Sequence, residues 1–426
     1  MIMPLFHAPS RRDVMLASGT LFAWTYLPKL ALAEGRDPRF LTIILRGALD
    51  GLATVAPVGD PDWIALRGDN ALTLDGKTPA LRLDNFFALN PAMRNLHRMF
   101  QANEAIIVHA CATPYRERSH FDGQDLLENG LPKPGLSDSG WLNRALSGLA
   151  PGGRVDPKGG KVFAVGPVTP LVVRGPAPVL SWSPQRVMPA SADTVQRLLD
   201  LYRHSDMKLA SVLEDGAKLT AMERSGDMVQ KDMAQKDVAQ KDVAQKPGGP
   251  GPAQVRAYFA EAAGTAAKFL AQPDGPRVGA LALDGWDTHS NEGIAQGHLS
   301  QLLGALDDAL AAVQTNMGSA WRDTVVVLAT EFGRTARING TEGTDHGTAT
   351  VALLVGGALK GGRVIADWPG LKSADLYENR DLKPTTDLRA VLKGLLKDHL
   401  RADDRVLAEN VFPGSSTIKP MRGLVA

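Results

Sequence analysis

The stretch VGALALDGWDTHSNE, residues Val278–Glu292, begins as an apolar run and becomes polar within two residues. A short apolar run of this kind predicts a buried β-strand. Asp284, Asp287 and His289 crowd the point where that strand would reach the surface. A loop needs polar residues, but it does not need two carboxylates and an imidazole within six positions. The motif therefore leaves two alternatives: capping of the following helix by ordinary loop residues, or a functional site.

Similar apolar runs recur along the chain and predict four further strands, at residues 40–45, 104–110, 324–330 and 348–357. An amphipathic helix is expected around Ile294–Val313, and a second over residues 386–400 with Thr386 or Asp387 as its N-cap. Strands that alternate with helices predict an α/β fold with a mostly parallel sheet covered on both faces. In such sheets ligands bind beyond the carboxyl ends of the strands, where the polar clusters of this sequence lie.

Residues 190–252 interrupt this pattern. Gln230–Lys246 is a five-residue repeat, and on a helix each step of five residues rotates the side chain by about 140°. Its apolar residues therefore share no single face. We expect a helical or low-complexity insertion that is solvated and carries no chemistry.

The N-terminus is expected to be a twin-arginine export signal covering residues 1–33. Arg11 and Arg12 precede a moderately apolar stretch, Val14–Leu27, and Ala31–Ala33 supplies the small residues of a cleavage site. These features predict a periplasmic or secreted protein that meets the twin-arginine translocase during export; the alternative is a cytosolic protein with a chance arginine pair. Lys29 interrupts a run already too short to span a bilayer, so we expect no stable membrane insertion.

Charge and cysteine content exclude several classes of function. The formal net charge is +1, and removal of the expected signal makes it −1. A near-neutral chain without a basic stripe argues against a nucleic-acid partner. Cys111 is the only cysteine, which excludes an internal disulfide and a thiolate-rich metal site. Any metal must therefore be held by carboxylates, imidazoles or hydroxyls.

The ends of the predicted strands carry a set of such groups, and we take them as candidate metal ligands: Asp50, Asp287, His289, Glu331, Asp345 and His346. Oxygen and imidazole ligands suit Zn²⁺, Mn²⁺, Mg²⁺ or Ca²⁺. Glu331 directly follows an apolar run, where a carboxylate is costly unless it is paired or bound to a cation. The alternative for Asp50 is a turn aspartate, and His289 taken alone is better explained as a loop histidine.

The segment YRERSHFDGQD, Tyr115–Asp125, supplies candidate catalytic and anion-binding residues. Ser119 and His120 begin a predicted helix, whose N-terminus, together with Arg116 and Arg118, would favour an anion. A hydroxyl here could attack phosphorus or sulfur beside a metal; alternatively Ser119 is an N-cap and the arginines are surface charges. Arg46 and Arg334, at other strand ends, are further candidate anion contacts.

Five segments occurring in order, LRGALDGL, YRERSHFDGQD, DGWDTHSN, ATEFGRT and GTDHGTA, resemble a secreted bacterial family known as domain of unknown function 1501. That family looks like a branch of the alkaline phosphatase–sulfatase superfamily. The resemblance implies a three-layer αβα sandwich over residues 34–426, with one or two metals at the strand ends.

The resemblance also implies roles for individual residues. It matches Asp50 to a ligand after the first strand, Ser119 to the nucleophile that opens a helix, and His346 to the last histidine ligand. An Asp-His pair expected after a later strand is replaced by Glu331 in EFG, which keeps the carboxylate, lacks the histidine and leaves both one metal and two as alternatives. Near Cys111 the proline of CATPYR comes one residue late for a sulfatase maturation motif, so no formylglycine is expected.

Together these features predict a periplasmic metal-dependent hydrolase of phosphate or sulfate esters, acting on a small-molecule or glycan ester. The expected cofactor is a divalent metal: Zn, Mn, Ca or Mg. The alternative is a non-catalytic binding or surface-assembly protein on the same fold that recognises anionic glycans.

Overall fold

The centre of the fold is strand β1 (Arg39–Arg46), whose β-branched and aliphatic residues are buried on both faces of the sheet. β1 pairs in parallel with β8 (Val278–Asp284) on one side and β9 (Thr324–Ala329) on the other. The computed structural model describes residues 36–135, 137–149, 162–183, 199, 202–203, 207, 209–215 and 251–426. The described residues from Pro38 to Ala426 form one compact unit.

The main sheet has nine strands in the described residues, in the order β11-β5-β10-β9-β1-β8-β6-β7, with β12 also paired to β5. The strands not yet defined are β5 (Ala105–Ala112), β6 (Val162–Val165), β7 (Val179–Trp182), β10 (Thr350–Val355), β11 (Arg363–Ile365) and β12 (Thr386–Asp387). All neighbouring pairs are parallel except those of β10, which runs antiparallel to both β5 and β9.

The reversed direction of β10 matters for the site. The start of an antiparallel strand lies at the same edge of the sheet as the carboxyl ends of its parallel neighbours. Residues that precede Thr350 therefore meet residues that follow β1, β8 and β9. The polar segment GTDHG, residues 343–347, lies at this common edge because it precedes β10.

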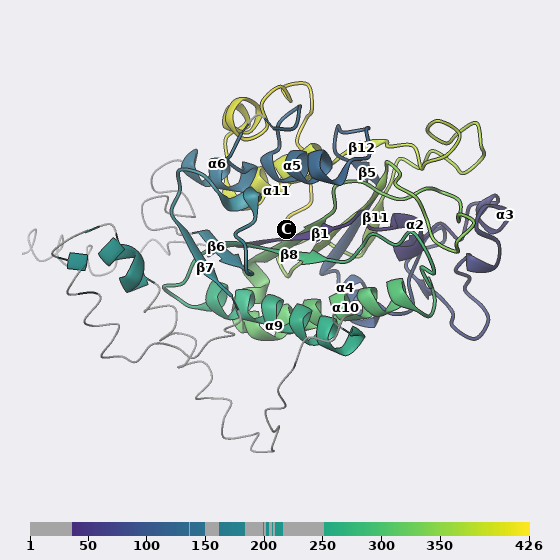
Figure 1. Ribbon diagram of the computed structural model, residues 1–426, viewed down its shortest axis with the longest axis horizontal. Helices are drawn as coiled ribbons and strands as arrows, with labels where there is room; N and C mark the ends of the chain where they lie inside the picture. The colour runs from purple at the N-terminus through teal and green to yellow at the C-terminus, as the bar shows by residue number, and fades with distance from the viewer. Residues whose placement is uncertain are drawn as a thin grey trace, which may run out of the picture. The chain divides into compact units, whose positions relative to one another are not determined.

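Helices cover both faces of the sheet (Figure 1). One face packs against α4 (Arg94–Gln101), α9 (Pro252–Ala271) and α10 (His298–Met317); the other packs against α5 (His120–Asn129), α6 (Trp141–Ser147) and α11 (Leu388–Leu400). Successive residues of β1 alternate between the two cores. Leu41 and Ile43 belong to the first, and Phe40 and Ile44 to the second. The fold is thus an αβα sandwich, and the expected α/β class with a mostly parallel sheet is confirmed.

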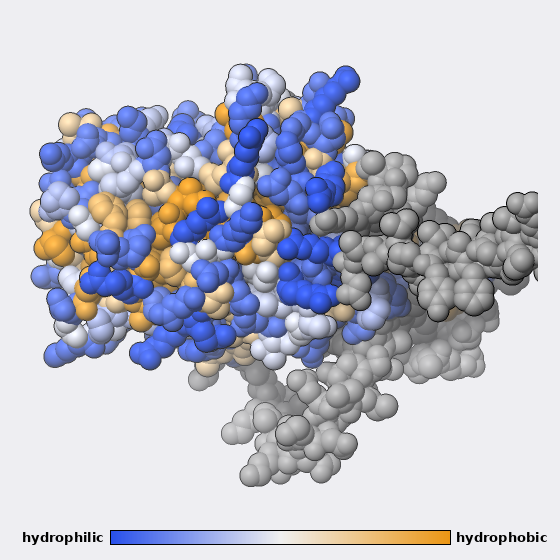
Figure 2. Space-filling view, turned by 180° about the vertical axis from the view of Figure 1, so that it is seen from behind, coloured by the Kyte–Doolittle hydropathy of each residue, from blue (hydrophilic) through white to orange (hydrophobic). Residues whose placement is uncertain are grey.

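The remaining elements are short. They include a small antiparallel sheet of β2 (Val55–Ala56), β4 (Ala88–Leu89) and β3 (Leu81–Arg82), helices α2 (Gly51–Thr54), α3 (Trp63–Arg67) and α12 (Asp404–Val406), and short 3₁₀- or π-helical segments at Gly68–Asn70, Leu171–Val173, Gly318–Asp323 and Leu407–Val411. Seen from behind, the surface carries hydrophobic residues in patches among hydrophilic ones (Figure 2). Among the helices that the structure describes, none has the length and hydropathy needed to cross a bilayer.

The predicted elements agree with the observed ones to within a few residues. The largest difference is α10, which begins at His298 rather than near Ile294, because Gly297 at φ 134° keeps the preceding backbone out of the helix. The N-cap of α11 is Asp387, whose side chain accepts a hydrogen bond from the backbone N–H of Arg389. The expected signal peptide lies outside the described residues. So does most of the expected insertion, including its repeat.

Candidate functional site

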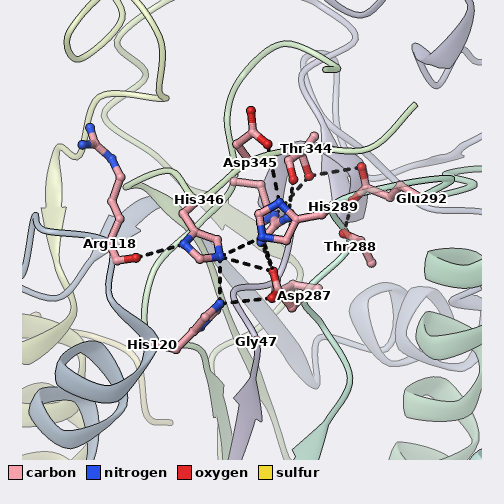
Figure 3. Close-up of polar contacts among 12 residues, drawn as sticks. Gly47, Arg118, His120, Asp287, Thr288, His289, Glu292, Thr344, Asp345 and His346 are labelled. Atoms are coloured by element: carbon pink, nitrogen blue, oxygen red, sulfur yellow. Dashed lines mark hydrogen bonds and ion pairs between the residues drawn. The ribbon is translucent and has the colours of Figure 1, made fainter. Parts of the chain in front are cut away.

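Three imidazoles and one carboxylate meet at the carboxyl edge of the sheet (Figure 3). His120 is the first residue of α5, Asp287 and His289 follow β8, and His346 precedes β10. The ligand atoms of His120, Asp287 and His346 all lie within 4.8 Å of one another. His289 adjoins this group.

The contacts within the cluster are short. Nε2 of His346 lies 2.9 Å from Nε2 of His120 and 3.0 Å from Nε2 of His289. The carboxylate of Asp287 lies 3.4 Å from Nε2 of His120 and 3.3 Å from Nε2 of His346. It lies 3.0 Å from Nε2 of His289. All four side chains therefore present ligand atoms to a common region.

The second nitrogen of each ring faces an acceptor outside this region. Nδ1 of His120 lies 2.8 Å from Oε1 of Glu331. Nδ1 of His346 lies 2.9 Å from the backbone carbonyl oxygen of Arg118, and Nδ1 of His289 faces Asp345 at 3.5 Å. A neutral imidazole with its proton on Nδ1 has a lone pair on Nε2. These partners therefore set the Nε2 atoms as acceptors.

An acceptor-only cluster requires a cation, a shared proton or a donor from a ligand. Its spacing fits a metal, since the ligand atoms of a tetrahedral zinc site, with bonds of about 2.0–2.1 Å, lie about 3.3 Å apart. The hydrogen bond to Glu331 raises the pKa of His120. Burial and the neighbouring His120 lower the pKa of His346, which favours the neutral ring that a metal needs.

Arg334 binds the carboxylate of Asp287. Nη1 of Arg334 donates to Oδ1 of Asp287 at 2.5 Å, and the Arg334 side chain is 0% exposed. Nε and Nη2 of the same guanidinium donate to the hydroxyl and the carbonyl of Thr344. Burial raises the pKa of Asp287, but the hydrogen bond and charge of Arg334 outweigh it, so the net shift is downward. Asp287 is therefore ionised at neutral pH.

Glu331 supports the cluster through its contact with the ring of His120. Its carboxylate is 0% exposed and accepts from Nδ1 of His120, the backbone N–H of Gly47 and the amide of Gln124. Burial acts to raise the pKa of Glu331, but these hydrogen bonds lower it overall. The carboxylate thus orients His120, where the sequence had suggested a direct metal ligand.

Two other expected ligands also lie outside the group. Asp50 caps α2 by accepting from the N–H of Ala53, and both its oxygens accept from Arg67, at 2.8 and 3.1 Å. Its carboxylate is thus committed to a buried ion pair. Asp345 stands behind His289 and accepts from the amide of Asn339 at 3.1 Å. Its position orients His289.

The four candidate anion-binding arginines are all occupied by protein acceptors. Arg46 pairs with Glu128, Arg116 donates to the carbonyls of Thr113 and Tyr115, Arg118 pairs with Glu378 and Asp381, and Arg334 holds Asp287. Each of these guanidinium groups thus already has an acceptor within the chain, and their contact with an anion stays a prediction.

Ser119 lies at the N-cap of α5, and its side chain does not cap the helix. Its backbone N–H donates to the hydroxyl of Tyr115 at 3.2 Å, and burial raises the pKa of that phenol. The described contacts of Ser119 include no imidazole or carboxylate that would act as a base. His120, expected beside Ser119 in catalysis, instead belongs to the cluster.

Sequence reasoning missed the groups that hold the cluster from outside. One such group is buried and consists of Thr288, Glu292 and Thr344. The hydroxyls of both threonines donate to the Glu292 carboxylate. Glu292 lies in the stretch that begins at Val278, and Thr344 lies in GTDHG. Their position in the sequence beside the candidate ligands was therefore the available signal. No sequence signal marks the backbone carbonyl of Arg118, because every residue has a backbone carbonyl.

Several solved structures are similar to this chain at low sequence identity. Ps i-CgsB in complex with k-i-k-neocarrahexaose is 8% identical, with 89% of this chain and 75% of that chain covered and a TM-score of 0.43. The PsFucS1 sulfatase from Pseudoalteromonas sp. is 12% identical, with 84% and 68% covered and a TM-score of 0.34. A protein in the alkaline phosphatase superfamily from Vibrio parahaemolyticus is 12% identical, with 75% and 60% covered and a TM-score of 0.33.

No curated protein matches the sequence. A family model does match, over residues 102–411, which include α5, the loop after β8 and the segment before β10. The matched region thus contains His120, Asp287 and His346. The chain belongs to the family described as "Protein of unknown function (DUF1501)".

Proposed function

We propose that this protein is a periplasmic, metal-dependent hydrolase of phosphate or sulfate esters. The observation that supports it most is the convergence of three imidazole Nε2 atoms and the Asp287 carboxylate, with the other nitrogen of each ring facing an acceptor. Four acceptors that face one another need a cation, a shared proton or a ligand donor between them, and the spacing of these atoms fits a cation.

His120, Asp287 and His346 would hold the metal, and His289 lies beside them. When bound, a divalent cation supplies Lewis-acid chemistry, drawing electron density from an ester oxygen and making water easier to deprotonate. Glu331 and the Arg118 carbonyl keep the two histidine rings in the tautomer that binds a metal. Arg334 keeps Asp287 ionised.

The N-terminus of α5 would receive the negative oxygens of the ester. The first-turn N–H groups of a helix have no acceptor within the helix, and the Ser119 side chain does not cap them. They begin at His120, which is itself part of the cluster. Because the four arginines are already paired, backbone donors would carry this role instead of guanidinium groups.

His289 is the imidazole best placed to exchange protons with solvent, since its side chain is 47% exposed. In the hydrolysis, a water oxygen forms a bond to phosphorus or sulfur while the bond to the ester oxygen breaks. The water gives up a proton and the leaving alcohol takes one. We assign proton transfer at the leaving group to His289, whose ring lies 3.0 Å from the Asp287 carboxylate.

The test is a substrate panel with purified protein lacking residues 1–33. Aryl phosphate, phosphodiester and aryl sulfate esters are each assayed with Zn²⁺, Mn²⁺, Ca²⁺ or Mg²⁺. We expect turnover with at least one pair of metal and substrate, and its loss in His120→Ala. Absence of turnover in every combination, with metal bound, would reject the hydrolase proposal.

A second candidate, a non-catalytic binding or surface-assembly protein, is favoured by one observation. Ser119, the expected nucleophile, has no base among its described contacts. On this proposal a metal-loaded protein would bind anionic glycans without altering them. A glycan array with metal-loaded and metal-free protein distinguishes the two candidates, since only the hydrolase would release sulfate or phosphate.

A further inference from the structure

The carbonyl of Arg118 holds His346 through an unusual backbone conformation. Arg118 has φ 60°, in the left-handed region that residues other than glycine rarely adopt. In this conformation its carbonyl oxygen accepts from Nδ1 of His346 at 2.9 Å (Figure 3). Such a conformation persists only when the surrounding structure enforces it.

Asp381 binds the side chain of Arg118. Its side chain is 0% exposed and accepts from Nε of Arg118 at 3.0 Å and Nη2 at 2.8 Å. The same carboxylate accepts from Nε of Arg380 at 2.8 Å, and Nη2 of Arg380 donates to the carbonyl of His346. Asp381 therefore binds both arginines that contact His346, one at the ring and one at the backbone.

The backbone around Asp381 is also fixed. Its N–H donates to the carbonyl of Tyr377, and its residue forms isolated bridges with Thr335 and Tyr377. Thr335 follows Arg334, which pairs with His346 in a further bridge. Asp381 is thus linked to His346 in three ways: through Arg118, through Arg380, and through Thr335 and its neighbour Arg334.

We propose that Asp381 is a positioning residue for the metal site, which fixes the ring orientation and tautomer of His346 through Arg118 and Arg380. The proposal rests on the proposed function, in which His346 is a metal ligand. Loss of the carboxylate would leave two guanidinium groups without their shared partner and release Arg118 from φ 60°. His346 would then lose the acceptor that keeps its proton on Nδ1.

The first experiment measures Zn²⁺ affinity by chelator competition for the wild type, Asp381→Asn and Glu378→Gln. Glu378 is the matched control, because it pairs with the same guanidinium of Arg118 but is 55% exposed. We expect Asp381→Asn to weaken Zn²⁺ binding by about 10- to 100-fold, the usual effect of removing a group that supports a ligand. Glu378→Gln should stay within about threefold of the wild type. If Asp381→Asn does not fold, Arg118→Gln replaces it and should shift affinity in the same direction.

A double-mutant cycle separates positioning from general stability. In a His346→Ala background, Asp381→Asn should weaken Zn²⁺ binding by no more than about threefold, because the residue it acts through is gone. An equal loss in both backgrounds would show that Asp381 supports the fold only. Equal loss from Glu378→Gln and Asp381→Asn would also overturn the proposal.

A second readout does not need metal. ¹⁵N spectra of histidine-labelled, metal-free protein at about pH 8 report the tautomer of each ring. Wild-type His346 should carry its proton on Nδ1, and Asp381→Asn should give a mixture; the same single tautomer in both proteins would refute the positioning role. If the wild type binds no Zn²⁺, the proposed function fails, and the tautomer comparison still decides whether Asp381 positions His346.

Discussion

Asp284 and Asp287 carry the same side chain three residues apart, but their surroundings differ. Both residues are exposed, but Asp284 ends β8, whereas Asp287 contacts His120, His289 and His346. We predict that Asp287→Asn lowers bound metal at least about tenfold, because it removes a charged ligand. Asp284→Asn, the same chemical change, should leave metal content unaltered. Elemental analysis of both proteins checks this, and equal metal loss would mean that the ligand is misassigned.

Glu292 offers a prediction about pH. Burial, with the nearby Asp50, raises the pKa of Glu292 from 4.5 to about 8. Between these values the folded protein holds a proton on Glu292 that the unfolded chain has released, so stability falls as pH rises through this window. Glu292→Gln removes the titration, and its amide oxygen can still accept from a threonine hydroxyl. The stability lost between about pH 5 and pH 9 should therefore shrink by at least about 1.4 kcal/mol, the equivalent of one pKa unit. Denaturant unfolding at both pH values measures it, and an unchanged pH dependence would contradict the assignment.

At the scale of elements, we predict that the start of helix α11 depends on one side chain, that of Asp387. Asp387 accepts from the N–H of Arg389 and also pairs with its guanidinium. Asp387→Ala should lower the free energy of unfolding by about 1 kcal/mol, the usual effect of losing an N-cap. Asp403→Ala, which removes the N-cap of the short and exposed α12, is the control and should have a smaller effect. Thermal or denaturant unfolding compares the two, and equal losses would show that capping of α11 has no special weight.

Five strands were predictable because they follow from local patterns, whereas β6, β7, β11 and β12 were not predicted. Apolar runs located β1, β5, β8, β9 and β10, and the direction of β10 explains why a motif before a strand joins motifs that follow strands. The residue types of the cluster were also predictable. Their division into ligands and supports was not, since it depends on contacts between distant residues. Glu331 and Asp287 are both carboxylates at strand ends, and only burial against Gly47 and Gln124 directs Glu331 to the ring of His120.

At the scale of the whole molecule, export is the property that the first residues predict. Replacement of Arg11 and Arg12 by Lys should leave precursor in the cytoplasm, because the arginine pair is the expected recognition feature of the signal. Cell fractionation with immunoblotting measures the distribution. Lys29→Arg, which leaves the pair intact, is the control and should be exported normally. Normal periplasmic accumulation of the Arg11/Arg12 double variant would exclude this route.

The central position of β10 has a consequence for the order of assembly. β10 joins β5 on one side to β9 on the other, although both precede it in the chain. Until Thr350–Val355 has been synthesised, each of these strands has an unpaired edge, and the pairings that close the sheet are distant in sequence. His120 and Asp287 already exist in the growing chain, but no strand yet joins the two halves of the sheet that carry them. The cluster of His120, Asp287, His289 and His346 is therefore among the last features to form, and a nascent chain that stops before β10 would have neither the complete sheet nor the proposed metal site.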